Sequence, residues 1–131
     1  MSRGREIVSP KGMAKATGYA YAIKKSGTPV FISGQVALDA NGNVVGEGDV
    51  AAQVEQVFQN LKSVVEGCGG SFADIVKINI YATSPAQRPA IAAARERWFP
   101  DGQYPASTYV VVAALAAPVF LVEIEAVAMI D

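Results

Sequence analysis

The stretch DVAAQVEQVFQNLKSVVEGCGGSFADIVKINIYAT, residues 49–83, decides the fold because its hydrophobic spacing changes halfway along. Its first part repeats apolar residues at intervals of three and four, which predicts an amphipathic helix. The repeated residues are Val50, Val54, Val57, Phe58, Leu61, Val64 and Val65. Asp49 is a good N-cap, and Gly67, Gly69 and Gly70 end the helix. Ile and Val then alternate with polar residues over 74–83, which predicts a strand.

Strand patterns precede this stretch. Residues 19–24 alternate weakly and predict a first strand, and 29–36 (PVFISGQV) predict a stronger one, rich in β-branched residues. The run DANGN at 39–43 contains the Asn-Gly pair of a tight turn.

A second helix and two strands follow. The helix begins at Pro85 or Pro89, both plausible first-turn prolines, and runs to Phe99. Strands are expected over 107–114 and 119–130. The order of elements predicts one α+β domain spanning residues 1–131, a mixed sheet with both helices on one face.

The two faces of that sheet differ in composition. On the last strand Phe120, Val122, Ile124, Ala126 and Ala128 share the face that suits packing under the helices. The opposite face carries Leu121, Glu123, Glu125, Val127 and Met129, and we assign Val111 of the preceding strand to it as well. This face is too apolar to leave in water, which predicts oligomerisation through the open sheet.

Composition excludes several classes of protein. The chain contains no histidine, which excludes Ser-His-Asp and Cys-His catalysis and His-ligated zinc. Its net charge of −1 gives no basic footprint for nucleic acid, and we expect no nucleic-acid partner. We also expect no membrane span and no signal peptide in MSRGREIVSPKG. The single cysteine, Cys68, suits a reducing cytoplasm.

The pair Glu123 and Glu125 is the best candidate for acid–base chemistry. Two carboxylates two residues apart lie on one strand face, where one of them could act as a general acid or base. The pattern also fits glutamates that make structural hydrogen bonds or face solvent, and spacing alone favours this structural interpretation.

Other candidates are weaker. Ser33 and Gly34 lie at a strand end, where a ligand could approach the backbone or where the chain simply turns. Ser107 and Tyr109 share a strand face and could donate hydroxyl groups, or Tyr109 could be an interface aromatic. Separately, we expect Cys68 to be unreactive, Arg95 and Arg97 to lie on a solvated helix face, and Trp98 and Phe99 to lie in the core.

Two runs carry a family resemblance. The run from ISGQVALDANGN through DIVKINIYAT resembles the central signature of the RidA/YjgF family, and YPASTYVVVAALAAPVFLVEIEAVAMID resembles its C-terminal signature. The SGQ, the glycines that end the helix and the closing V-E-I-E-A are specific in combination. The resemblance covers residues 17–129.

The resemblance implies a chorismate-mutase-like fold, a homotrimer and a small-molecule cleft between subunits, and it implies no metal or organic cofactor. Archetypal members hydrolyse reactive enamines and imines such as 2-aminoacrylate. Matching positions are Tyr19, Ser33 and Glu123, the last being the family's water-activating or proton-relaying glutamate.

The sequence also departs from the family. Where archetypal members have an arginine that holds the substrate carboxylate, this chain has Ser107. A neutral hydroxyl cannot replace a bidentate guanidinium. A family cysteine is Tyr109 here, and an asparagine of the second helix aligns with Ala92.

These features favour a hydrolase or deaminase acting on a small imine, enamine or related metabolite other than 2-aminoacrylate. Glu123 would handle water, while Tyr19, Ser33, Gly34, Ser107 and Tyr109 would bind the ligand. The alternative is a trimer that binds a metabolite or partner without catalysis. Endoribonuclease activity is disfavoured by the charge and by the lack of histidine.

Overall fold

The computed structural model describes residues 4–131, so the first three residues of the MSRGREIVSPKG stretch lie outside it. A four-stranded sheet has the order β3-β6-β4-β5 and is built from β3 (Thr28–Gln35), β4 (Ile75–Ala82), β5 (Ala106–Val111) and β6 (Val122–Ile130). β6 is antiparallel to both neighbours, and β4 and β5 are parallel. The α+β class and the mixed sheet are therefore confirmed.

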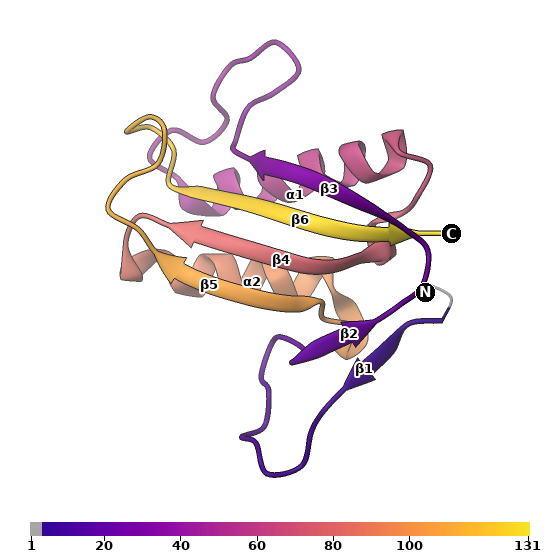
Figure 1. Ribbon diagram of the computed structural model, residues 1–131. Helices are drawn as coiled ribbons and strands as arrows, with labels where there is room; N and C mark the ends of the chain where they lie inside the picture. Colours follow the sequence, from indigo (N-terminus) through magenta and orange to yellow (C-terminus); the bar gives the residue numbers. More distant parts are fainter. Residues whose placement is uncertain (1–3) are drawn as a thin grey trace.

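Two helices cover one face of this sheet. α1 (Val50–Gly67) and α2 (Arg88–Trp98) both lie behind it in Figure 1, as the sequence predicted. Asp49 caps α1, its carboxylate accepting from the Ala52 amide at 3.2 Å. A 3-10 turn, Pro85–Gln87, precedes α2, so Pro85 starts the turn and Pro89 falls in the first turn of the helix.

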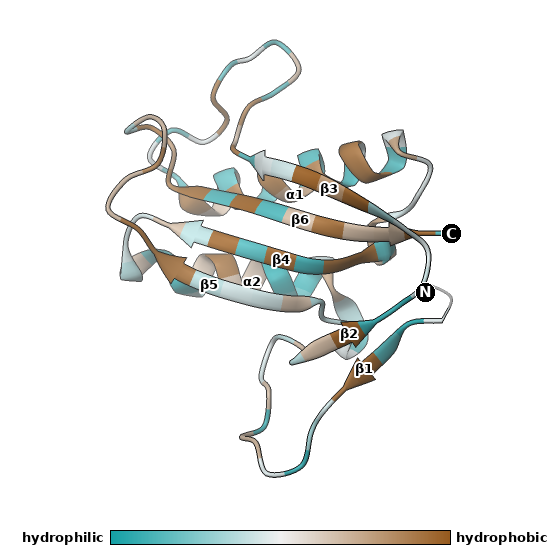
Figure 2. Cartoon of the chain, in the orientation of Figure 1, coloured by the Kyte–Doolittle hydropathy of each residue, from teal (hydrophilic) through white to brown (hydrophobic). Residues whose placement is uncertain are grey.

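The core lies between the helices and the sheet. Val54, Val57, Phe58, Leu61 and Val65 of α1 are all fully buried, and Val50 and Val64 pack at the margin. On β6 the residues Val122, Ile124, Ala126, Ala128 and Ile130 face this core. Figure 2 shows the resulting alternation of hydropathy along the strands. Spacing alone predicted the α1 set and four of these β6 residues; Ile130 was not predicted, and Phe120, which was, lies before the strand and outside the buried core.

The strand bounds were less well predicted. Of residues 19–24, only β2 (Ala22–Lys24) is a strand, paired with β1 (Glu6–Val8) in a separate ribbon next to β5 (Figure 1). β5 ends at Val111 and β6 starts at Val122, so both strands are shorter than expected. Val111 and Val122 both pair with Ala82, the last residue of β4, so β5 ends and β6 begins where β4 ends.

The open face is partly apolar. Phe31 is 79% exposed and pairs with Val127 across β3 and β6, while Val110 is 40% exposed on β5. Val111 was assigned to this face wrongly. It pairs with the buried Ala82 of β4 and so lies on the helix side. Among residues 4–131 we find no helix long and apolar enough to span a bilayer.

Candidate functional site

Glu123 lies where a bulge in β3 meets β6. The β3–β6 register shifts between Ile32 and Gln35, and Ser33 and Gly34 form the irregular step. A Cβ on Gly34 would lie 2.8 Å from Glu123 Cδ, so only glycine leaves room for the carboxylate at this point. The bulge thus brings Gly34 and Glu123 together, while Ser33 beside them is exposed.

The two glutamates of β6 have different surroundings. Glu125 accepts hydrogen bonds from Asn79 Nδ2 at 3.2 Å and from the Tyr81 hydroxyl. Glu123 is half-buried, and within residues 4–131 it has no hydrogen bond or ion pair. Glu125 therefore has a structural role, and Glu123 is the carboxylate left free for a ligand or water.

Tyr81 reports the charge of this region. Its hydrogen bond to Glu125 raises the pKa of Tyr81, and its own desolvation and the charges of Glu125 and Glu123 raise the pKa further. Tyr81 is opposite Glu123 in the β4–β6 register, which explains why both carboxylates influence it.

A buried glutamine positions the start of β6, and sequence reasoning missed it. Gln53 of α1 is fully buried and donates to the carbonyls of Gly46 and Val119 at 3.1 and 2.9 Å. Its side-chain oxygen accepts from the Leu121 amide at 2.9 Å. One signal was present: Gln53 is three residues after Val50 and four before Val57, a polar residue on the apolar helix face.

Asn60, also missed, holds the chain that follows the bulge. Its Nδ2 donates to the carbonyls of Val36 and Leu38 at 3.2 and 3.0 Å. α1 therefore supports both strands that form the Glu123 region. Which strands the two side chains support was not predictable, because the bonds to Val36, Leu38, Val119 and Leu121 span more than twenty residues of sequence.

Within one chain, Ser107 and Tyr109 lie on the opposite face of the sheet from Glu123. They pair with Ile78 and Ile80, whose side chains point to the core, so both face the helix side of β5. Glu123 belongs to the open face, and one strand, β4, lies between β6 and β5. One chain alone does not bring these residues together.

Tyr109 and Arg88 form a polar site at the β5 edge. The Arg88 guanidinium lies 5.3 Å from the centre of the Tyr109 ring, a cation–π distance. Burial raises the pKa of Tyr109, and the positive charge of Arg88 partly offsets that rise. Within the described chain the Tyr109 hydroxyl is buried without a hydrogen-bond partner. This edge is therefore incomplete as it stands.

Tyr19 belongs to the β5 side as well. Its neighbour Ala20 forms a parallel bridge with Ala106, directly before Ser107, and its ring packs edge-on against Tyr21 at 5.5 Å. The candidate residues thus form two groups: Ser33, Gly34 and Glu123 at the β3–β6 bulge, and Tyr19, Ser107 and Tyr109 at the β5 edge. We call them the bulge group and the edge group.

Of the two arginines predicted on a solvated face of α2, one is exposed and the other is not. Arg97 is exposed and pairs with Glu55 at 3.1 Å, as expected for a solvated face. Arg95 is not solvated: its side chain is 20% exposed, packs where a Cβ on Gly18 would clash, and lies 5.9 Å from the Tyr104 ring. Gly18 allows this packing because it has no side chain, which spacing on α2 could not reveal.

Comparison with known proteins agrees with this geometry. The family model described as Endoribonuclease L-PSP matches residues 10–130. The chain is 34% identical over 124 residues to the 3-aminoacrylate deaminase RutC of Acinetobacter baylyi, covering 95% of this chain and 97% of that protein. It is 32% identical to the 2-iminobutanoate/2-iminopropanoate deaminase of Dermatophagoides farinae, over the whole of both chains.

Solved structures give the same result. YyfB of Yersinia pestis, a protein of the conserved Rid family, superposes with a TM-score of 0.89 at 37% identity, covering 96% of this chain and 98% of that one. RidA of the Antarctic bacterium Psychrobacter superposes at 0.73 with 34% identity, covering 95% and 98%. The chain belongs to the RidA/YjgF family. Named relatives in it include imine and aminoacrylate deaminases.

Proposed function

We propose that the protein is a cofactor-independent hydrolase of a small imine or enamine, with Glu123 as the group that handles water. The observation that carries the proposal is the contrast on β6: Glu125 is held by two donors, and Glu123 is held by none in the described chain. The deaminase names of two full-length relatives supply the substrate class.

The chemistry requires one carboxylate and one water. Glu123 removes a proton from the water as its oxygen forms a bond to the imine carbon, and the C=N double bond becomes a single bond. The carboxyl then returns the proton to nitrogen, which gives a carbinolamine. The carboxylate next carries the proton of the carbinolamine hydroxyl group to nitrogen, the C–N bond breaks as the C=O bond forms, and a carbonyl compound and ammonia leave. An enamine substrate first takes a proton at carbon and loses one from nitrogen to become the imine. The balance is imine plus water to carbonyl plus ammonia.

The edge group completes the site from a second copy of the chain. Because the bulge group and the edge group lie on opposite faces of the sheet, a cleft containing both needs two copies. The exposed Phe31 and Val110 on the open face favour such an assembly, which we propose to be a homotrimer. A monomeric mass in sedimentation at micromolar concentration would contradict this part.

The substrate is proposed to differ from 2-aminoacrylate. Ser107 cannot clamp a carboxylate as an arginine does. Arg88 brings a guanidinium to the same edge, next to Tyr109. It offers a substrate a single cation at a position other than that of the family arginine. Arg88→Gln should therefore weaken the binding of carboxylated imines and leave the binding of uncarboxylated imines unchanged.

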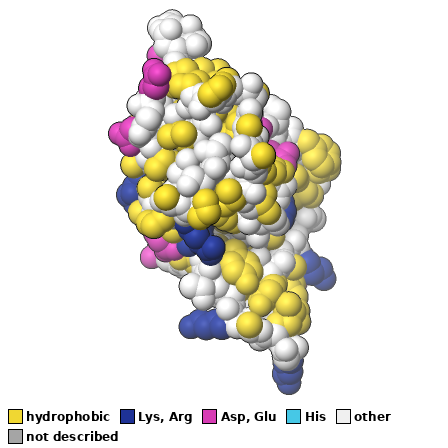
Figure 3. All heavy atoms as spheres, turned by 90° about the vertical axis from the view of Figure 1, so that its left-hand side faces the viewer, with side chains coloured by type: hydrophobic (Ala, Val, Ile, Leu, Met, Phe, Trp, Pro, Cys, Tyr) yellow, Lys and Arg dark blue, Asp and Glu magenta, His cyan; other side chains and the backbone are white. Residues whose placement is uncertain are grey.

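The test is turnover of a panel of carboxylated and uncarboxylated imines, measured by ammonia release. Glu123→Gln should lower turnover by at least 100-fold, and the matched Glu125→Gln by much less. Binding of a panel member without conversion by wild-type protein would favour the alternative, a trimer that only binds metabolites. On the face in Figure 3 the Lys and Arg side chains stand apart from one another, which gives RNA no continuous basic surface.

A further inference from the structure

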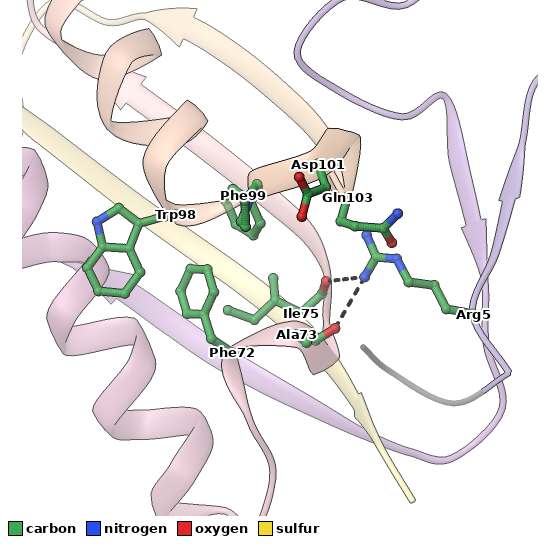
Figure 4. A pocket seen from close by; sticks show the side chains of 9 residues that line it. Arg5, Phe72, Ala73, Ile75, Trp98, Phe99, Asp101 and Gln103 are labelled. Carbon is green, nitrogen blue, oxygen red and sulfur yellow. Dashed lines mark hydrogen bonds between the residues drawn. The ribbon is translucent and has the colours of Figure 1, made fainter.

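A cavity lies on the other side of the sheet from Glu123. It measures about 470 Å³ and lies where the end of α2, the turn Phe72–Asp74 and the segment bearing Arg5 meet (Figure 4). This volume is in the range of small-molecule sites. Nothing in the proposed hydrolase chemistry uses it.

One wall of the cavity is aromatic. The Phe72 ring lies 5.0 Å from Trp98 and 4.9 Å from Phe99, measured between centroids. The Trp98 Nε1 already donates to Glu55 at 3.2 Å, so the indole offers the cavity an apolar ring. Such a wall suits a flat apolar group.

The other end of the cavity contains an unpaired cation. Arg5 is half-buried and donates to the carbonyls of Ala73, Ile75 and Tyr104 at 3.3, 3.1 and 2.8 Å. These bonds orient the guanidinium and give it no counter-charge: Arg5 has no ion pair within residues 4–131. Desolvation lowers the pKa of Arg5, the expected effect of burying a charge without its partner. An anion would relieve that cost.

Asp101 lines the same end and is conformationally unusual. Its φ of 59° is in the left-handed region, and it is the one non-glycine residue of the described chain there. Aspartate tolerates this region better than most residues, but such strain gathers at functional sites. Asp101 is in no ion pair within residues 4–131, including with Arg5 at the same end of the cavity.

We propose that this cavity binds a free amino acid with an aromatic side chain. Arg5 takes its carboxylate, Asp101 takes its ammonium group, and the ring packs on Phe72, Trp98 and Phe99. Arg5 has donors left for this, because three of the five N–H groups of a guanidinium are engaged. The two unpaired charges match the charged groups of an amino acid, and the aromatic wall matches its ring.

The experiment uses Trp98, the only tryptophan in the chain, as its own reporter. Three probes are titrated while tryptophan fluorescence is followed: L-phenylalanine, 3-phenylpropanoate, which lacks the ammonium group, and phenethylamine, which lacks the carboxylate. We expect saturable binding of L-phenylalanine, with each analogue at least tenfold weaker because it leaves one charge unpaired. No saturable response to L-phenylalanine at millimolar concentration overturns the proposal, as does equal affinity for all three probes.

Variants assign the two charges. Arg5→Gln should weaken the binding of L-phenylalanine and 3-phenylpropanoate at least tenfold and leave the binding of phenethylamine unchanged. Asp101→Asn should weaken the binding of L-phenylalanine and phenethylamine at least tenfold and leave the binding of 3-phenylpropanoate unchanged. Lys62→Gln, on an exposed pair of α1, is the matched control and should change nothing. If Arg5→Gln fails to fold, Arg5→Lys and Asp101→Asn carry the test. Unchanged affinity in Asp101→Asn, or in the folded Arg5 variant, overturns the proposal.

Glu123→Gln separates this site from the proposed hydrolase site. Binding of L-phenylalanine should be unchanged in that variant, because Glu123 lies on the opposite face of the sheet. Loss of binding in Glu123→Gln would contradict a separate site, whatever happens to hydrolysis.

Discussion

The bulge group and the edge group differ in how far a single chain completes them. At the bulge, the Glu123 side chain lies against Gly34, and Gln53 and Asn60 of α1 secure both strands. At the edge, the Tyr109 hydroxyl is buried without a partner in the described chain, next to the exposed Arg88. The part that handles water is built by one chain, and the part that grips a ligand is left for another molecule to complete.

Gly34→Ala is the substitution that we expect to disrupt the bulge group most. The new Cβ would meet the Glu123 carboxylate and force it from its place, which we expect to lower imine turnover about 100-fold. Gly67→Ala is the control, because no atom lies within 4 Å of a Cβ there and its φ is not positive. Turnover and thermal unfolding are measured together. Full activity in a folded Gly34→Ala protein would remove Glu123 from the mechanism.

Gln53→Leu tests whether α1 supports the bulge group. It leaves the Gly46 and Val119 carbonyls and the Leu121 amide buried without partners, which should lower the free energy of unfolding by about 3 kcal/mol. The exposed Gln59→Leu on the same helix should change it by less than about 0.5 kcal/mol. Urea unfolding measures both. Equal stability of the two variants would mean that the start of β6 does not depend on Gln53.

Tyr109→Phe probes the edge group. The hydroxyl has no partner to lose in the described chain, so any effect must come from a ligand or a second copy. We expect KM for the imine to rise about fivefold with kcat unchanged, the loss of one hydrogen bond used in binding. A fall in kcat with unchanged KM would place Tyr109 with the chemistry and erase the difference between the two groups.

The smallest effect expected is on the titration of Tyr81. Glu125→Gln should bring the pKa of Tyr81 down towards its ordinary value, and Glu123→Gln should lower it less, because Glu123 acts through charge alone. Since the folded value is raised, this group stabilises the protein below the unfolded pKa of about 10 and the contribution is lost as pH rises through the folded value. Ultraviolet titration of tyrosinate measures it, with Tyr81→Phe identifying the signal. If both glutamate variants lowered the pKa of Tyr81 equally, the hydrogen bond between Tyr81 and Glu125 would be contradicted.

Local spacing was enough to predict the layers of this fold. The apolar repeat of α1, the Asp49 cap and the alternation along β6 each depend on residues close together in sequence, where helix and strand geometry alone sets which side chains share a face. The element ends were harder. β5 stops at Val111 because its partner β4 ends at Ala82, a fact of pairing that β5 does not contain.

The site divides in the same way. The sequence singled out Glu123, Ser33 and Ser107 through residue type and family resemblance, and it placed Glu123 and Glu125 on one face through the period of a strand. Spacing left the two glutamates equivalent, and the family resemblance favoured Glu123. The tertiary structure supplies the physical difference between them, because Asn79 and Tyr81 reach Glu125 from a strand more than forty residues away. Tertiary structure likewise put Ser107 and Tyr109 on the face opposite Glu123, since the side a strand presents depends on its register with its neighbours, and a one-residue change in register reverses it.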